Sequence, residues 1–158
     1  MASTHGPYQV WAWYRQFYVL DPDQLGDTGS PEFWTQEAMA SRLAVVPGVI
    51  GIGTDTNGEV PVTVEILDAE PTLSLSPWDH VAEASLELST GRLALAGCPD
   101  WDLPVATISL APGWFRVRVH SAGLTDQPPE VVYSGDSYLV QVWASASGER
   151  TVLKRFRN

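Results

Sequence analysis

The sequence predicts an all-β protein: an antiparallel β-sandwich of eight or nine strands with one short helix. Three observations lead to this fold class. Short segments alternate apolar and polar residues, turn signals containing Gly and Pro separate them, and only one segment carries the start signals of a helix. Because strands do not alternate with helices along the chain, a parallel α/β sheet is not expected.

Strand periodicity is clearest in 80–88, where apolar residues at every second position alternate with Glu83, Ser85 and Glu87. The expected strands are 8–20, 49–53, 62–67, 80–88, 92–96, 105–110, 114–120, 137–143 and 149–156. In 114–120 the same alternation points Arg116 and Arg118 away from the core.

Turn and cap signals divide the chain between these strands. Asn57-Gly58 tolerates the positive φ angles of a tight turn, so we expect a hairpin between the two strands that flank it. Ser30 as a cap and Pro31 in the first turn predict one short helix over 32–42. The proline-containing stretch 123–135 is expected to be a surface loop. With 158 residues, one domain spanning 1–158 is the expectation.

The chain is strongly acidic, with 19 acidic and 9 basic residues and a net charge of −10. Ten acids and one base lie between Asp55 and Asp102, so this stretch carries a charge of −9. Such a balance repels nucleic acid and anionic membranes and attracts basic partners. No run of about 18 apolar residues is present, and residues 1–6 do not resemble a secretory signal, so we expect a cytoplasmic protein without a membrane span.

Catalytic patterns are missing from the sequence. There is no G-x-S-x-G motif, and the three histidines are far apart in the chain. A metal site built from His80, His120 and an aspartate would need strands to bring them together, and their spacing does not indicate it. We expect His80 at a strand end beside Asp79, and His120 on a solvated face beside Arg118. The sequence therefore predicts no enzyme, no metal and no cofactor.

Other features that suggest chemistry have simpler explanations. The stretch 48–53 (GVIGIG) has neither the Lys-Ser/Thr nor the helix of a phosphate loop, so its glycines are expected to allow a bulge or close sheet packing. Asp100 and Asp102 resemble a glycosidase couple but are expected to be solvated. Cys98, the only cysteine, is expected to be a small buried residue.

Two alternatives exist for the arginines of 114–120. Together with Trp114, Arg116 and Arg118 resemble a small patch that would bind nucleic acid by stacking and phosphate contact. The net charge opposes that function. The arginines could instead pair across strands with outward glutamates.

The outward acids suggest a docking surface. If the strands that carry Glu65, Glu83 and Glu87 lie side by side, their carboxylates form one negative face. Rows of carboxylates on a rigid sheet can imitate a phosphate backbone and speed association with a basic cleft. We therefore expect a basic protein partner to contact these three glutamates, with Trp78, Asp79 and Asp102 at the rim. Trp101 is a further candidate there.

Several segments resemble the competence protein J (ComJ) family. They are Trp13–Val19 (WYRQFYV), Trp34–Ala38 (WTQEA), Ala44–Ile50 (AVVPGVI), Ile108–Val117 (ISLAPGWFRV) and Gly135–Val140 (GDSYLV). The resemblance extends over about residues 11–145. It implies a non-enzymatic, cytoplasmic β protein that inhibits a partner nuclease, and related small β proteins serve as immunity proteins to nuclease toxins. It assigns no inhibitory contact to an individual residue.

Two other functions stay open. A sandwich that binds a small ligand or a carbohydrate would stack a sugar on Trp11, Trp13, Trp101 or Trp114. An enzyme would need His and Asp residues that converge only in three dimensions. Most of the seven tryptophans are nevertheless expected to fill the core of the sandwich.

Overall fold

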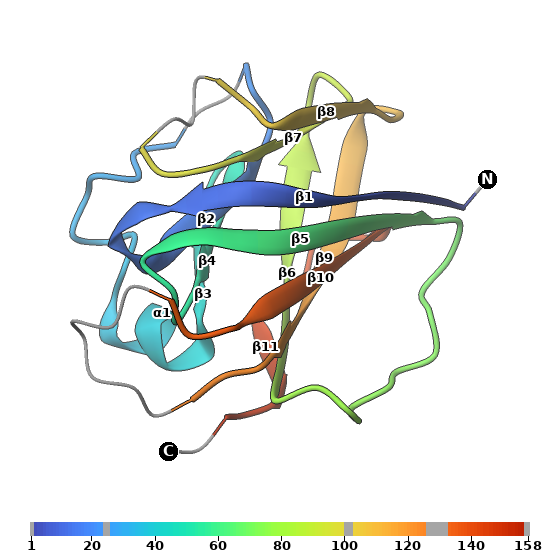
Figure 1. The fold of residues 1–158 in the computed structure, drawn as a ribbon. Helices are drawn as coiled ribbons and strands as arrows, with labels where there is room; N and C mark the ends of the chain where they lie inside the picture. Colours follow the sequence, from blue (N-terminus) through green and yellow to red (C-terminus); the bar gives the residue numbers. More distant parts are fainter. Residues whose placement is uncertain (1, 24–25, 100–102, 126–132, 157–158) are drawn as a thin grey trace.

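The structure is a computed structural model that describes residues 2–23, 26–99, 103–125 and 133–156. Its strands are β1 (Ser3–Ala12), β2 (Gln16–Leu20), β3 (Leu43–Val46), β4 (Val49–Gly53), β5 (Gly58–Leu67), β6 (His80–Leu88), β7 (Arg92–Ala96), β8 (Ala106–Ser109), β9 (Gly113–Ala122), β10 (Ser137–Ala144) and β11 (Thr151–Lys154). They form a six-stranded sheet of order β1-β5-β10-β9-β6-β11 and a five-stranded sheet of order β3-β4-β2-β7-β8 (Figure 1). The predicted β-sandwich class is confirmed.

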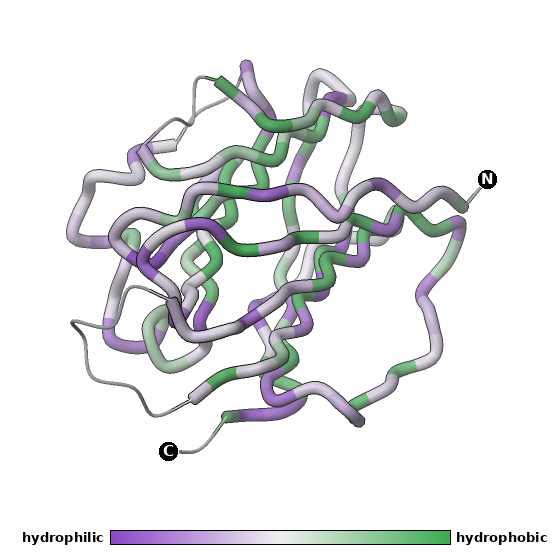
Figure 2. The backbone as a smooth tube through the Cα atoms, in the orientation of Figure 1, coloured by the Kyte–Doolittle hydropathy of each residue, from purple (hydrophilic) through white to green (hydrophobic). Residues whose placement is uncertain are grey.

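The core lies between the two sheets. Alternate residues of β5, among them Val60, Val62 and Val64, are buried and face Phe17 and Ile52 from the other sheet. Hydrophobic and hydrophilic residues alternate along the strands in Figure 2, as period-2 patterning requires. Burying this apolar surface, at about 25 cal/mol per Å², is the main force that holds the sheets together.

The described residues contain eleven strands, two more than the nine ranges expected from the sequence. The expected strand 8–20 is broken by a 3₁₀ turn, η1 (Trp13–Arg15), into β1 and β2, which belong to different sheets. β3 was not among the strands predicted from periodicity. One pairing, β5 with β10, is parallel, with Val62 opposite Tyr138. The remaining pairings are antiparallel, as predicted.

The predicted hairpin at Asn57-Gly58 is wrong. This turn joins β4 in the five-stranded sheet to β5 in the six-stranded sheet, so its two flanking strands do not pair. Both strands send apolar side chains into the same core from opposite sides. Their sequence pattern is therefore the same as that of two paired strands.

The helix α1 (Gln36–Ser41) begins later than predicted. Its N-cap is Thr35, whose hydroxyl accepts a hydrogen bond of 3.1 Å from the backbone N–H of Ala38. Ser30 instead starts a turn that directs Phe33 into the core. A Cβ atom on Gly51 would lie 2.7 Å from the Phe33 ring, which confirms that a glycine of 48–53 permits close packing. No helix in the described ranges is long and apolar enough to cross a membrane.

The outermost strands are short or irregular. β11, β3 and β8 have four residues each. β1 is longer, but its register against β5 shifts between His5 and Tyr8, around Pro7. The outward side of the six-stranded sheet carries the three predicted contact glutamates, Glu65, Glu83 and Glu87.

Candidate functional site

An ion-pair cluster occupies the middle of the outward side of the six-stranded sheet. Glu83 on β6 accepts hydrogen bonds from Arg116 Nε at 2.6 Å and from Arg118 Nε at 2.9 Å, both on β9. The three side chains are only 12%, 10% and 3% exposed, in that order. Of the two alternatives for the arginines, the structure shows cross-strand pairing with a glutamate.

Other parts of the chain cover this cluster. The Arg118 guanidinium lies 4.8 Å from the ring centre of Trp143 and also contacts Glu70 and the carbonyl of Pro71, in the β5–β6 connection. Arg116 donates to the Glu149 carbonyl at 2.6 Å, in the segment that leads to β11. Both guanidiniums are thus occupied within the protein and do not form an open nucleic-acid patch.

The prediction that His120 is solvated is wrong. His120 is 2% exposed and its ring lies 5.0 Å from that of Trp78, because the β5–β6 connection covers it. Burial lowers the pKa of His120, a shift that its hydrogen bond to the Leu139 carbonyl only partly opposes.

His80 begins β6 beside Asp79, as predicted. Its Nε2–H donates to the Ser41 carbonyl at 2.8 Å, and its Nδ1 accepts from the backbone N–H of Phe156 at 3.0 Å. Burial lowers the pKa of His80, a shift that the hydrogen bond to the Ser41 carbonyl only partly opposes and that the positive charges of Arg42 and Arg155 reinforce. His80 is paired with Ser121, the neighbour of His120, so the two histidines point to opposite faces of the sheet. The described residues hold no group of three or more possible metal ligands.

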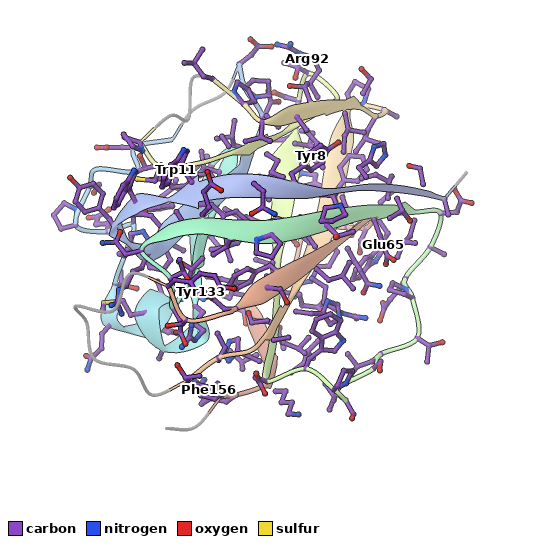
Figure 3. The ribbon with its side chains drawn as sticks, in the orientation of Figure 1. Tyr8, Trp11, Glu65, Arg92, Tyr133 and Phe156 are labelled. Carbon is purple, nitrogen blue, oxygen red and sulfur yellow. The ribbon has the colours of Figure 1, made fainter. Side chains whose placement is uncertain are left out.

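The predicted acidic contact residues do not form one continuous row. β5 and β6 are not neighbours: β10 and β9 lie between them. Glu65 and Glu83 do share the outward face, but Gln141 and Arg118 stand between them in the paired register. Glu65 accepts a hydrogen bond of 2.9 Å from Gln141 and lies toward one end of the sheet (Figure 3). Glu83 is neutralised by its two arginines.

The rim residues are partly engaged. Asp79 accepts a hydrogen bond of 3.0 Å from the backbone N–H of Leu124, and Trp78, also half-buried, packs on His120. Asp102, together with Asp100 and Trp101, lies outside the described residues.

Glu87 lies in a different environment, at the far end of β6. It lines a cavity of about 410 Å³ together with Trp114, which is 43% exposed, and apolar residues that include Val45, Pro47 and Leu86. Glu87 and Trp114 are opposite each other in the β6–β9 pairing. A carboxylate beside an exposed indole, over an apolar floor, suits an incoming cationic side chain.

The prediction that most tryptophans fill the core is wrong. Of the six in the described ranges, only Trp143 is buried, and it lies on the outward face rather than between the sheets. Trp11 and Trp13 stack with ring centres 5.3 Å apart and are 44% and 41% exposed. They lie where β1 ends and η1 begins, at the end of the sandwich opposite Glu65 (Figure 3).

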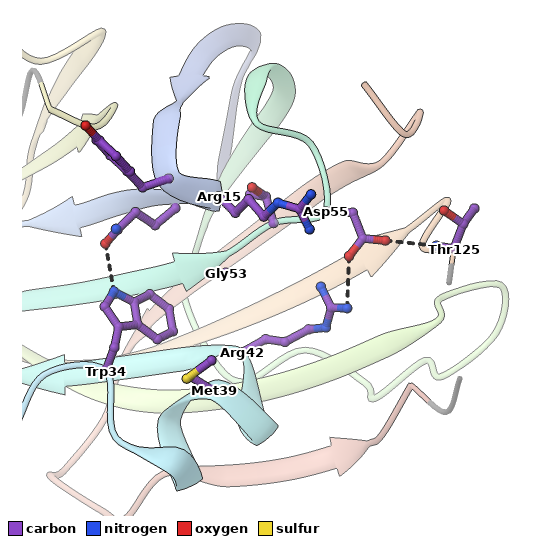
Figure 4. A pocket seen from close by; sticks show the side chains of 10 residues that line it. Arg15, Trp34, Met39, Arg42, Gly53, Asp55 and Thr125 are labelled. Atoms are coloured by element: carbon purple, nitrogen blue, oxygen red, sulfur yellow. Dashed lines mark hydrogen bonds and ion pairs between the residues drawn. The ribbon is translucent and has the colours of Figure 1, made fainter. Parts of the chain in front are cut away.

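A second cavity, of about 400 Å³, opens next to η1 (Figure 4). In the described ranges, only three residues other than glycine have left-handed backbone angles: Tyr14 (φ 60°), Arg15 (φ 59°) and Arg42 (φ 59°). All three line this cavity. Each left-handed residue costs roughly 1–2 kcal/mol, so neighbouring bonds must hold it in place. Asn57 accepts from the Tyr14 N–H at 2.9 Å, and the Arg15 carbonyl accepts from the Thr54 N–H at 2.9 Å.

Side chains from the two sequence segments 13–19 and 34–38 meet in this cavity. The Trp34 indole N–H donates to Gln16 Oε1 at 2.7 Å (Figure 4). Across from them, Arg42 donates to Asp55 Oδ1 at 3.0 Å and also lies 5.6 Å from the ring centre of Phe156. The Arg42 guanidinium is thus fixed from two sides.

The buried carboxylate of Asp136 fixes the backbone next to this cavity. Asp136 accepts from the backbone N–H groups of Asp55 at 2.9 Å and Thr56 at 3.2 Å, and from the hydroxyls of Thr56 and Tyr138. Burial and the neighbouring Asp136 raise the pKa of Tyr138, so the phenol remains a donor. The Asp136 bonds fix the position of Asp55, and Asp55 in turn holds Arg42.

Cys98 is 6% exposed and accepts a hydrogen bond of 3.4 Å from the Tyr18 hydroxyl, which confirms a small buried residue. Burial raises the pKa of Tyr18. Sequence reasoning missed the cavity beside η1, because a left-handed backbone at Tyr, Arg and Arg has no sequence signal. The only indication was that 13–19 and 34–38 both carried the family resemblance.

Comparison with known proteins gives matches in structure only. No family model and no curated protein matches the chain. The crystal structure of ComJ from Bacillus subtilis, described as the inhibitor of the DNA degrading activity of NucA, is similar with a TM-score of 0.69 and 14% sequence identity, covering 92% of this chain and 99% of that one. The Crocagin biosynthetic gene J protein is similar with a TM-score of 0.57 and 14% identity, covering 92% and 98%. The predicted resemblance is confirmed for the fold: this chain adopts a ComJ-like fold.

Proposed function

We propose that this chain is a non-enzymatic, cytoplasmic protein that binds a basic partner, a nuclease, and inhibits it, without a cofactor and without contacting nucleic acid itself. The observation that carries this proposal is the likeness of nearly the whole chain to ComJ, an inhibitor of a nuclease's DNA degrading activity. The net charge of −10 supports it independently, because an acidic surface favours association with a basic cleft.

The proposed contact surface contains the predicted acidic residues, which we expect to contribute unequally because their surroundings differ. Glu87 is the foremost contact, since a lysine or arginine of the nuclease would meet its carboxylate and the face of Trp114 in one cavity. Glu65, Asp79 and Trp78 extend the surface, together with Asp102. Glu83 contributes by fixing Arg116 and Arg118.

The test is inhibition of DNA degradation by purified nucleases, beginning with NucA and a panel of other basic nucleases, at low and high salt. We expect inhibition of at least one, with association that slows as salt rises. Glu87→Gln and Trp114→Ala should each weaken inhibition by about tenfold or more, as for residues at the centre of an interface. Glu37→Gln, at an 85% exposed side chain on α1, is the matched control and should change nothing. No inhibition of any nuclease, and no nuclease recovered from the native lysate, would refute the proposal.

Binding of a carbohydrate is the second candidate, because Trp11 and Trp13 form an exposed aromatic surface. It predicts changes in tryptophan fluorescence that depend on the glycan and hardly on salt. A charge-steered protein complex, in contrast, should associate more slowly as salt rises.

A further inference from the structure

A pair of stacked tryptophans forms an exposed surface where β1 ends (Figure 3). The ring planes of Trp11 and Trp13 are inclined by only 5°, and the two side chains are 44% and 41% exposed. Trp11 lies on the outward face of the six-stranded sheet, because its neighbours Val10 and Ala12 are buried in the core. Indoles supply a large, rigid contact area and are enriched at binding surfaces. The pair is therefore a candidate binding surface that the proposed inhibition does not use.

A carboxylate without a partner stands beside these rings. Glu59 on β5 is directly opposite Trp11 in the β1–β5 pairing, so the two side chains project from the same face with Cβ atoms roughly 5 Å apart. Glu59 is exposed, and within the described ranges it makes no hydrogen bond or ion pair. Its carboxylate is thus open to a cation next to an aromatic face, in a chain of net charge −10.

The backbone that carries the rings is fixed on both sides. The Trp11 carbonyl accepts a hydrogen bond of 2.9 Å from the Cys98 N–H. Beyond the second ring, the Tyr14 N–H donates to Asn57 Oδ1 at 2.9 Å, and Asn57 lies two residues before Glu59 on the chain. The rings and the carboxylate are therefore held in one arrangement before anything binds, so little conformational freedom is lost on binding.

This combination of groups suits a guanidinium. A cation is attracted to the face of an indole, and a planar guanidinium can lie flat on that face while its N–H groups bond a carboxylate at the side. An ammonium is a compact, strongly hydrated charge and makes less use of a flat ring. A sugar can also stack on the rings, but its hydroxyls bond an amide as well as a carboxylate, so the charge of Glu59 separates the two ligands.

The tryptophan surface lies far from the Glu87 cavity. In the paired register, Glu65 and Arg118 are on one level across the six-stranded sheet. Glu59 lies six residues from that level toward one end of the sheet, and Trp114 lies four residues from it toward the other. At about 3.3 Å per residue, roughly 30 Å separates the two sites along the strands. Binding at one site therefore does not require the other.

We propose that Trp11, Trp13 and Glu59 form a docking site for an arginine side chain of a protein partner. The guanidinium stacks on an indole face and bonds the Glu59 carboxylate. The occupant belongs to a protein, because a small molecule is usually enclosed by its site, whereas rings this exposed suit one anchor within a larger interface. The site does not depend on the inhibition proposed above, since it shares no residue with the Glu87 cavity.

The test uses three blocked tripeptides with glycine on both sides of a central residue, which is arginine, lysine or citrulline. Citrulline keeps the planar shape of arginine but is neutral. NMR titrations follow the indole N–H signals of Trp11 and Trp13, which report binding at this surface. We expect the arginine peptide to bind about tenfold more tightly than the citrulline peptide and about threefold more tightly than the lysine peptide, with an affinity that falls as salt rises. Equal affinity for arginine and citrulline, lysine binding as tightly as arginine, or no shift of either signal at millimolar peptide would overturn the proposal.

Variants locate the contact. Trp13→Ala, followed at the Trp11 signal, and Glu59→Gln should each weaken the arginine peptide by about threefold or more, and both side chains are exposed, so circular dichroism should show an unchanged fold. Glu37→Gln, on α1, removes the same charge from an 85% exposed position and is the matched control, which should leave the affinity unchanged. Unchanged affinity in Glu59→Gln, or an equal loss in Glu37→Gln, would show that no specific carboxylate is involved and would overturn the proposal.

Discussion

Replacing Glu83 by Gln should strongly destabilise the fold, although the exchange is nearly isosteric. The carboxylate is 12% exposed and is bonded to two guanidiniums that are themselves 10% and 3% exposed. Removing one partner of a buried ion pair leaves an uncompensated charge and typically costs about 3–5 kcal/mol. Here two charges would lose their main partner, and the new amide N–H₂ would face them.

Other partners of the arginines reduce the loss but do not remove it. Arg118 keeps Glu70 at 3.3 Å, a side chain that is 67% exposed, and Arg116 keeps Ser85 and the Glu149 carbonyl. We therefore expect the lower end of the range, about 3 kcal/mol. That is a large share of the roughly 5–15 kcal/mol by which folded domains are stable.

Urea unfolding at pH 7, followed by circular dichroism, measures the effect. Glu65→Gln is the control: its carboxylate accepts one hydrogen bond from Gln141, so we expect a loss of about 1 kcal/mol or less. If Glu83→Gln unfolds within about 1 kcal/mol of the parent protein, the cluster is not the buried network described above. A large loss also means that partner binding should be tested with Glu87 rather than Glu83.

Three further predictions concern other parts of the molecule. Tyr14→Gly should raise the free energy of unfolding by about 0.5–1 kcal/mol, because relief of left-handed strain exceeds the entropy cost of glycine, whereas Tyr14→Ala should give no such gain in the same urea assay. Asp136→Asn should cost about 2–4 kcal/mol, because the amide keeps only one neutral accepting oxygen and turns an N–H₂ group toward donors that the carboxylate now accepts from. Chemical shifts of Asp55 should also move, and a loss under about 1 kcal/mol would contradict the role given to Asp136. The pKa values of His80 and His120 lie below 6.5 in the folded protein, so below pH 6.5 the unfolded chain binds more protons than the folded chain. The free energy of unfolding should therefore fall below pH 6.5, by up to about 1.4 kcal/mol per pH unit for each histidine. Urea unfolding measured between pH 7.5 and pH 5 tests this, and equal stability at both pH values would contradict it.

Local pattern predicted the sheet content and the direction of side chains. The alternation in 80–88 and 114–120 placed Glu83, Arg116 and Arg118 on one face, and the structure confirms it. Cross-strand pairing was among the alternatives because neighbouring strands bring such side chains within reach.

Which strands are neighbours could not be predicted. After a turn, the next strand either pairs with the previous one or enters the opposite sheet, and in both cases it buries alternate residues in the same core. The sequence pattern around Asn57-Gly58 therefore could not distinguish a hairpin from the observed crossing between sheets. For the same reason, the sequence pattern could not predict that β10 and β9 separate Glu65 from Glu83. The burial of His120 depends on the β5–β6 connection, which folds back over the sheet and places Trp78 on His120. The alternation of residues within a strand carries no information about such a connection.

The cavity beside η1 depends on residues that are far apart in sequence. Tyr14, Trp34, Arg42 and Asp55 meet only because β2 and β4 pair and α1 ends beside them. Their backbone strain is set by tertiary bonds, not by residue type.

The outer strands of both sheets restrict how any partner can attach. An edge with a long, regular row of free N–H and C=O groups invites another chain to add a strand. Here three of the four edges offer four residues each, and the fourth is interrupted at Pro7, which has no N–H, and by the shift in register beside it. The sheet edges therefore offer few free backbone groups to an added strand. We expect neither self-association nor partner binding to proceed by strand addition. A partner has to recognise this protein by its side chains, and individual substitutions should therefore separate one binding event from another.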